Sequence, residues 1–351
     1  MVASSSAPTN LTLSDYLAYG SYVGPSDVSA NLELIGINHR QIPRPVPINK
    51  ERMGYVFFSR PAMNMSSANF AGIPELAPIY NTENPISLKR YIRHMLDPRL
   101  TQNTGVKCPL LIDDLGLIPL FTNFLESLSG APEPSIDIWT SQPNQYGGVF
   151  SMADGHCKTY GQFTVSTSFR NMPGSPILDM ARLWTSYQAY VHDGQMSPHP
   201  DMLVQNEVDS QVGIYIFKMD HTNRFVTHMT WIPVAHPINP PTSAYADYNN
   251  KDVYNDAHHT LNIQWNCIGV YYDHPIIFWA FNRLITSFCP SMADGAREKA
   301  FIQLDGDDLV TFNNVGYPRV NYKTNELEWW VRNADYAAVK NMQAAFSYST
   351  K

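Results

Sequence analysis

The stretch from Val212 to Pro233 constrains the fold more than any other part of this 351-residue sequence. It consists of VGIYIFKM, the polar segment DHTN, and RFVTHMTWIP. Two runs rich in β-branched and aromatic residues, joined by a short polar segment, are typical of a β-hairpin. We therefore expect two antiparallel strands here, within a sheet that is mostly antiparallel.

Alternation of apolar and polar residues predicts further strands, and helical spacing predicts one main helix. GQFTVSTSFR and HHTLNIQWNCIGVYYD each place their apolar side chains on one face of a strand, and ELEWWV predicts a late strand. The inward-facing residues are expected to be Phe163, Val165, Thr167 and Phe169 in the first strand, and Leu261, Ile263, Trp265 and Cys267 in the second. Apolar residues from Ser175 to about His192 keep the spacing of an amphipathic helix. PIIFWAFNRLITSF and NADYAAVKNMQAAFS are two further candidate helices.

The first 130 residues have a different character. GYVFFSRP predicts a strand that Pro61 either ends or places at the edge of a sheet. Apolar spacing predicts helices from Asn84 to Leu96 and from Leu115 to Gly130, before a short strand near residues 136–140. We therefore expect three parts, which are an extended Pro-rich arm over 1–50, a mainly helical part over 51–130, and an antiparallel β domain with packed helices over 131–351.

Two segments near the N-terminus are candidates for contacts with partners. The sequence IPRPVPIN excludes a helix and favours a polyproline conformation, which either lies across a neighbouring subunit or leads along the surface into the first strand. GYVFFSRPAMNMS contains no His, Cys, Asp or Glu, which argues against a catalytic loop. It is either the exit of an edge strand near an assembly surface or a plain buried strand. The candidate interface residues are Pro43, Pro45, Pro47, Arg60, Pro61 and Asn64.

The composition bears on the kinds of partner. Only 16% of the residues are charged, against about a quarter in typical domains, while the chain contains 20 Tyr and 7 Trp. Tyr and Trp are enriched at protein interfaces, so the surface is either covered by partners or the chain has a large core with uncharged polar loops. The net charge is −7, and no basic cluster could neutralise nucleic-acid phosphates. We expect no specific nucleic-acid binding, although an acidic protein can let DNA slide past without binding it.

Cysteine usage and the N-terminal sequence favour a protein made and assembled in the cytosol. Cys108, Cys157, Cys267 and Cys289 are widely spaced and form no CxxC motif, which is typical of reduced thiols. The N-terminal residues lack the basic and apolar regions of a signal peptide. No apolar run is long enough to span a bilayer, so we expect no membrane contact.

Motifs for catalysis and metal binding are weak. The chain has no GxGxxG, GxxxxGK[ST], HExxH or GxSxG motif. DGHC, from Asp154 to Cys157, is better explained by a turn than by a nucleophile, and a hydrolase that uses Cys157 ranks last among the functions considered. His258 and His259 would point to opposite faces of a strand and do not suit one metal ion. We expect no cofactor and no metal site.

Several segments carry a resemblance to a known class of proteins. They are GYVFFSRPAMNMSSANF, RLWTSYQAYVHDG, and DSQVGIYIFKMD followed by RFVTHMTWIPVAHPINPP. Together they resemble virion structural proteins of large contractile-tailed bacteriophages, in which a GYxFF(T/S)RPxLNL segment occurs in tail or baseplate components. The resemblance spans about Gly54 to Pro241, together with the late WWV strand. It implies no enzymatic activity and a tail-tube-like core that forms rings or docks on them.

We therefore expect an α+β fold, with a mostly antiparallel β sandwich or open barrel, one main packed helix and a helical N-terminal part. The expected function is that of a non-enzymatic structural subunit of a phage tail, at the baseplate or associated with the tube. It would be assembled in the host cytoplasm and located in the virion, with other tail proteins and further copies of itself as partners. The alternative is a host-surface carbohydrate-binding module that uses exposed aromatic residues such as Trp139 and Trp329.

Overall fold

The structure is a computed structural model of the chain. It describes residues 54–76, 84, 86–105, 107–156, 161–172, 174–220, 222–245, 260–312 and 316–349. The predicted arm with Pro43, Pro45 and Pro47 lies outside the described residues, as do Cys157, His258 and His259.

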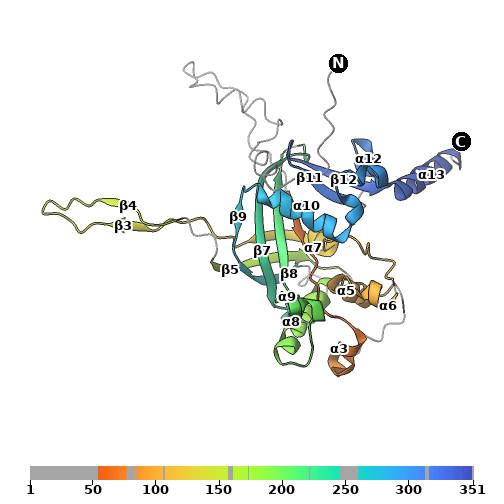
Figure 1. Cartoon of the computed structure of the whole chain (residues 1–351), viewed down its shortest axis with the longest axis horizontal. Helices are drawn as coiled ribbons and strands as arrows, with labels where there is room; N and C mark the ends of the chain where they lie inside the picture. Colours follow the sequence, from red (N-terminus) through yellow and green to blue (C-terminus); the bar gives the residue numbers. More distant parts are fainter. Residues whose placement is uncertain are drawn as a thin grey trace, which may run out of the picture.

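An antiparallel sheet forms the centre of the described structure (Figure 1). Its strand order is β1-β6-β7-β8-β5-β2, and β9 pairs with β7 outside this order. The strands are β1 (Tyr55–Phe58), β2 (Leu125–Ser129), β5 (Gln162–Arg170), β6 (Val212–Met219), β7 (Val226–Asn239), β8 (Thr260–Ile268) and β9 (Tyr271–Tyr272). The pairing of β6 with β7 confirms the predicted hairpin. β1 is an edge strand of the sheet, which is one of the two positions predicted from Pro61.

Two smaller sheets accompany the central one. The first has the order β10-β12-β11 and consists of β10 (Phe301–Gln303), β11 (Tyr317–Asn321) and β12 (Glu326–Arg332). The second is a hairpin of β3 (Ile138–Thr140) and β4 (Ser151–Ala153), which projects from the body at the left of Figure 1.

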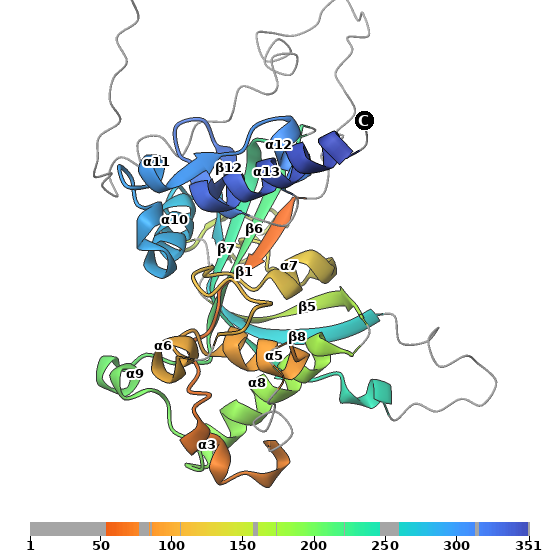
Figure 2. The same ribbon diagram turned by 90° about the vertical axis from the view of Figure 1, so that its right-hand side faces the viewer.

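Helices cover the central sheet and flank the smaller one (Figure 2). The two long helices that pack on strands of the central sheet are α8 (Pro176–His192) and α10 (Ile276–Phe288). The others are α3 (Ser67–Ala71), α5 (Leu88–Leu96), α6 (Leu100–Thr104), α7 (Pro119–Phe124), α9 (Pro200–Gln205), α11 (Arg297–Ala300), α12 (Asp307–Thr311) and α13 (Asn333–Ser349). Short 3₁₀ turns lie at Pro74–Leu76, Thr242–Tyr245 and Pro290–Met292.

The two adjacent aromatic residues of β1 belong to two separate cores. Successive side chains of a strand point to opposite faces of its sheet. Phe58 therefore joins the core on the α8 side, with its ring 5.5 Å from that of Trp265. Phe57 joins the core on the α10 side, with its ring 5.2 Å from that of Phe281. This end of the sheet is covered on both faces, which explains why its sequence is apolar without interruption.

The other half of the sheet is covered on one face only. In β5 and β8 the predicted alternation is confirmed, because Val165, Phe169 and Trp265 are buried while the residues between them face outward. The outward-facing side chains of the paired strands are Thr164 opposite Asn266, Ser166 opposite Gln264, and Ser168 opposite Asn262. Arg170 lies opposite Thr260 at the end of this face, which is otherwise mostly polar and uncharged along β5 and β8.

The fold combines helices with antiparallel sheets, as expected, but the central sheet does not close into a barrel. The predicted helix from Leu115 to Gly130 is confirmed only over α7, because α7 begins at Pro119 and ends at Phe124, where the chain continues as β2. Pairing of β2 with β5 overrides the helical spacing of the apolar residues there. The division of the chain near residue 130 remains a prediction, and strands from both sides of it share the central sheet.

The start of β1 is a point of close backbone approach. A Cβ atom added to Gly54 would lie 1.5 Å from the carbonyl oxygen of Phe217 in β6. Gly54→Ala should therefore push β1 away from β6 and lower the free energy of unfolding by roughly 1–3 kcal/mol. Gly72→Ala is the matched control, since a Cβ there meets nothing within 4 Å. Urea unfolding checks this, and equal stabilities of the two variants would contradict the close approach.

Candidate interaction surfaces

The predicted interface residues that follow β1 lie inside the molecule. Arg60 is 5% exposed and Asn64 is 9% exposed, and Pro61 between them is also buried. The segment from Ser59 to Ser66 leaves the sheet and runs between α5 and the loop after α8. Whether it contacts a partner remains a prediction, but in the folded chain these residues have internal roles.

Arg60 is a buried clamp that donates hydrogen bonds to four backbone carbonyl groups. Its Nη2 donates to His94 O at 2.7 Å and its Nε to Met95 O at 3.1 Å. Both acceptors lie in the last turn of α5, where a positive charge is stabilised by the helix dipole. Its Nη1 donates to Asp113 O at 2.8 Å and to Leu115 O at 3.3 Å. Burial lowers the pKa of Arg60 to about 10, so the guanidinium remains charged at neutral pH.

Asn64 and the residue after it are held by polar groups from distant elements. The backbone N–H of Asn64 donates to Tyr187 Oη in α8 at 3.2 Å, and its side-chain Nδ2 donates to Ser197 O at 3.0 Å. The N–H of Met65 donates to Oδ2 of the buried Asp97 at 3.0 Å. These bonds fix the path of the segment between the sheet and the helices.

Among the described residues, exposed large apolar side chains gather most in one segment, for which the sequence predicted only a short strand. The β3–β4 arm, residues 136–154, extends away from the body in Figure 1. Trp139 lies opposite Met152, and both side chains are about half exposed, at 48% and 51%. The exposed apolar residues of the arm are Ile136, Ile138, Trp139, Tyr146, Val149, Phe150 and Met152.

The tip of the β3–β4 arm has a defined local structure. Oδ1 of Asn144 accepts hydrogen bonds from the N–H groups of Tyr146 at 3.0 Å and Gly148 at 2.8 Å. Gly147 has a φ of 76°, a left-handed conformation that favours glycine. The turn therefore holds Tyr146 at the end of the arm with 93% of its surface exposed.

The composition of the arm bears on its stability in water. No residue from Ile138 to Ala153 is charged, and apolar side chains lie on both faces of the hairpin. A two-stranded hairpin by itself is at best marginally stable in water. Exposed apolar surface of this kind typically marks an interaction site.

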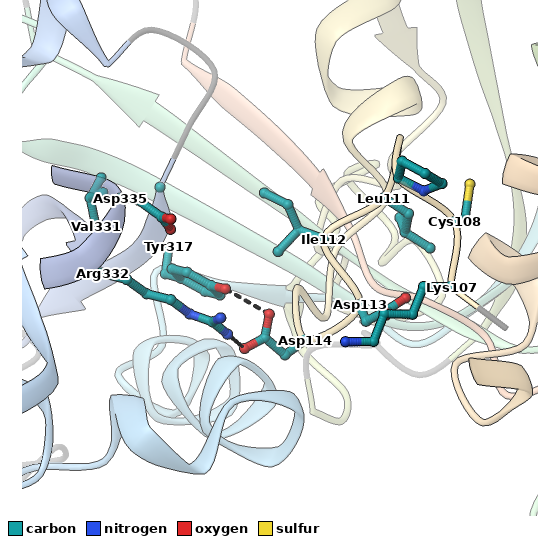
Figure 3. Close-up of a pocket in the computed structure, with 12 residues that line it drawn as sticks. Lys107, Cys108, Leu111, Ile112, Asp113, Asp114, Tyr317, Val331, Arg332 and Asp335 are labelled. Carbon is teal, nitrogen blue, oxygen red and sulfur yellow. Dashed lines mark hydrogen bonds and ion pairs between the residues drawn. The ribbon is translucent and has the colours of Figure 1, made fainter. Parts of the chain in front are cut away.

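A pocket of about 710 Å³ lies between the loop before α7 and the β10-β12-β11 sheet (Figure 3). We call it the side pocket. Its first wall consists of Lys107, Cys108, Pro109, Leu111, Ile112, Asp113 and Asp114, and its second wall consists of Gly316, Tyr317, Val331, Arg332 and Asp335. In the first wall, the side chain of Ile112 extends into the space between the two walls and is 39% exposed.

Polar contacts join the two walls of the side pocket. Tyr317 Oη donates to Asp114 Oδ1 at 2.6 Å, and Arg332 forms an ion pair with Oδ2 of the same carboxylate. Burial raises the pKa of the Tyr317 hydroxyl, which therefore stays protonated as a donor. The charge of Asp114 is thus compensated within the pocket.

The other sequence predictions concern chemistry and aromatic platforms. Among the described residues, no group of three or more His, Cys, Asp or Glu side chains is placed to hold a metal ion. No helix in the described part of the chain is long and apolar enough to cross a membrane. Trp329 is half-buried against Tyr55, with ring centroids 5.7 Å apart, so it offers no open platform for a sugar. Trp139 is exposed, but on the β3–β4 arm.

Replacing Arg60 should destabilise the whole chain. Arg60→Met leaves four buried carbonyl groups without their charged donor, so the free energy of unfolding should fall by roughly 2–4 kcal/mol. Arg99→Met is the control, because Arg99 makes a solvent-exposed ion pair with Asp201 that should contribute little to stability. Chemical unfolding of both variants checks this. Similar losses in the two variants would contradict the assigned role of Arg60.

His94 should make stability depend on pH. Burial, with a smaller effect of Arg90, lowers the pKa of His94 from 6.5 to about 4. Between these pH values the unfolded chain binds the extra proton, so the free energy of unfolding should fall as the pH falls, by up to about 3 kcal/mol. His94→Gln should lose this part of the pH dependence. Unfolding curves at pH 7, 6, 5 and 4 test it, and parallel profiles for both proteins would refute it.

Comparisons with known proteins identify the family. A family model described as "Putative phage tail tube protein" matches residues 14–346. Among solved structures, the tube-terminating cap of the anti-feeding prophage is 13% identical, with 45% of this chain and 81% of that chain covered and a TM-score of 0.27. The sheath/tube terminator of the extracellular contractile injection system PVC is 12% identical, with 44% and 86% covered and a TM-score of 0.25. The sheath–tube complex of the same system gives 15% identity, 45% and 82% coverage and a TM-score of 0.26.

No curated protein matches the chain. The family match extends over nearly the whole sequence and confirms the predicted resemblance to structural proteins of phage tails. The chain belongs to the family of phage tail tube proteins.

Proposed function

We propose that this chain is a non-enzymatic structural subunit of a phage tail that assembles with copies of itself, in the tube or in a tube-associated part such as the baseplate. The observation that carries the proposal is the β3–β4 arm, which carries no charge from Ile138 to Ala153, is apolar on both faces and is exposed in the single chain. The apolar side chains of this arm are not buried by the rest of their own chain. Burying them against a neighbouring subunit would therefore stabilise an assembly.

The two edge strands of the central sheet, β1 and β2, differ in whether the chain covers them, so copies could join in one direction only. At β1, Phe58 O accepts a hydrogen bond from Ile118 N–H at 2.8 Å, and Arg60 N–H donates to Gly116 O at 3.0 Å, so the chain covers this edge itself. At the opposite end, β2 pairs only with β5 among the described strands. An uncovered strand edge is a place where another chain can add a strand. We assign the outer edge of β2 as a second contact surface.

The mostly uncharged face of β5 and β8 suits the wall of a channel for nucleic acid. Thr164, Ser166, Asn262 and Gln264 face outward there, and the basic residue on this face of the two strands is Arg170 at the end of β5. A cluster of basic side chains would bind phosphates and retain DNA, whereas a face with a single Arg at one end, in a chain of net charge −7, would bind DNA weakly. This face is proposed to line the channel, and the helices on the other face are then outside.

Variants of the arm test the proposal. The double variant Tyr146→Ser with Phe150→Ser should stay monomeric under conditions in which the unmodified chain forms rings or tubes, because it removes apolar surface from the interface. Its melting temperature should match that of the parent, since both side chains are exposed, at 93% and 61%. Light scattering after gel filtration and negative-stain electron microscopy measure the outcome.

A matched control uses apolar residues exposed elsewhere. Leu203→Ser with Val204→Ser removes two exposed side chains from α9, and this variant should assemble like the parent. A parent chain that remains monomeric at every concentration, or an arm variant that assembles as well as the control, would refute the proposal.

A further inference from the structure

We propose that the tip of the β3–β4 arm of one copy docks in the side pocket of the next copy, so that the subunits join head to tail. This inference rests on the proposed function. It adds the surface that receives the arm and the direction in which copies are joined.

The arm and the side pocket lie on opposite sides of the chain. In Figure 1 the arm extends to the left, whereas α6 and α13, which are adjacent in sequence to the two walls of the pocket, lie on the right. Figure 2, viewed from that right-hand side, shows α6 and α13 on the near face. An arm in this position cannot reach the pocket of its own chain, so an arm that occupies a pocket belongs to another copy.

The tip is already shaped for insertion. The hydrogen bonds to Asn144 Oδ1 and the left-handed Gly147 hold the turn before any partner is present. Little conformational entropy is then lost when the tip docks, which favours binding. The tip offers the ring of Tyr146 with its hydroxyl group, and the side chains of Val149 and Phe150 next to it.

The side pocket matches the tip in chemistry. Leu111, Ile112 and Val331 give it apolar walls, and its volume of about 710 Å³ lies within the range of about 300–1,000 Å³ that is typical of binding pockets. The pair of Asp114 with Arg332 is satisfied within the wall, so an uncharged tip does not leave a charge unpaired there.

The rim of the side pocket suits the one polar group at the tip. Lys107 and Asp335 are exposed at the rim, and either could exchange a hydrogen bond with the Tyr146 hydroxyl. Neither the walls nor the rim therefore opposes entry of the tip.

A contact between two different surfaces has a consequence for symmetry. When the surface that projects differs from the surface that receives, each copy can bind one neighbour on each side. Such contacts produce rings when the rotation closes and helical tubes when it does not. A tube can be built from either form.

Site-specific photocrosslinking tests where the tip goes. The photoreactive residue p-benzoylphenylalanine is placed at position 146, and separately at position 145, in the full-length chain. After assembly and irradiation, mass spectrometry identifies the crosslinked peptides. We expect crosslinks between copies that join the tip to residues 107–114 or 316–335, and no such product from the same residue placed at exposed position 204 in α9.

The outcomes separate this inference from the proposed function. Assembled particles whose tip crosslinks elsewhere, or not at all from either position, overturn the pocket assignment and leave self-assembly intact. An unmodified chain that never assembles overturns both. Dilution below the assembly concentration before irradiation should abolish the crosslinks, and their persistence in monomers would show an intramolecular contact and overturn the inference.

Discussion

The buried guanidinium of Arg60 joins parts of the chain that are far apart in sequence. It lies directly after β1, closes the last turn of α5 through two carbonyl groups, and holds the loop before α7 through two more. That loop includes Asp113 and Asp114, which form part of a wall of the side pocket. The same hydrogen bonds that fix the edge of the central sheet thus fix a surface that we assign to a partner. The position of this surface depends on the packing around Arg60.

The central sheet divides into two halves with different environments, and this division bears on function. Near β1 both faces are covered, and the adjacent residues Phe57 and Phe58 belong to two separate cores. Along β5 and β8 only one face is covered, and the other is mostly polar, with Arg170 as its basic residue at the end of β5. The first half provides a core on each face, while the second provides a surface without the cluster of basic residues that binding of DNA phosphates requires. The β3–β4 arm projects from the body and has no cover within its own chain.

Much of the fold could be predicted from periodicity, because the β6–β7 hairpin and α8 have patterns that local sequence determines. The end of α7 at Phe124 could not, since it depends on pairing with β5, whose residues lie some forty positions later. The role of Arg60 was hidden for a similar reason, as its acceptors include carbonyl groups 34 to 55 positions away. The side pocket has walls joined by Tyr317 and Asp114, which are 203 positions apart. The arm left a visible signal, an uncharged apolar stretch around an Asn and two Gly residues, but the same stretch also fits a buried hairpin.

The central claim is that the β3–β4 arm is uncovered in a single copy and covered in the assembly, while the segment around Arg60 is buried in both. Hydrogen–deuterium exchange of dispersed and assembled protein measures this most directly. We predict that amides from 138 to 153 exchange at least about tenfold more slowly after assembly, whereas those from 59 to 66 are protected equally in both states. Equal exchange of the arm in the two states would contradict the account.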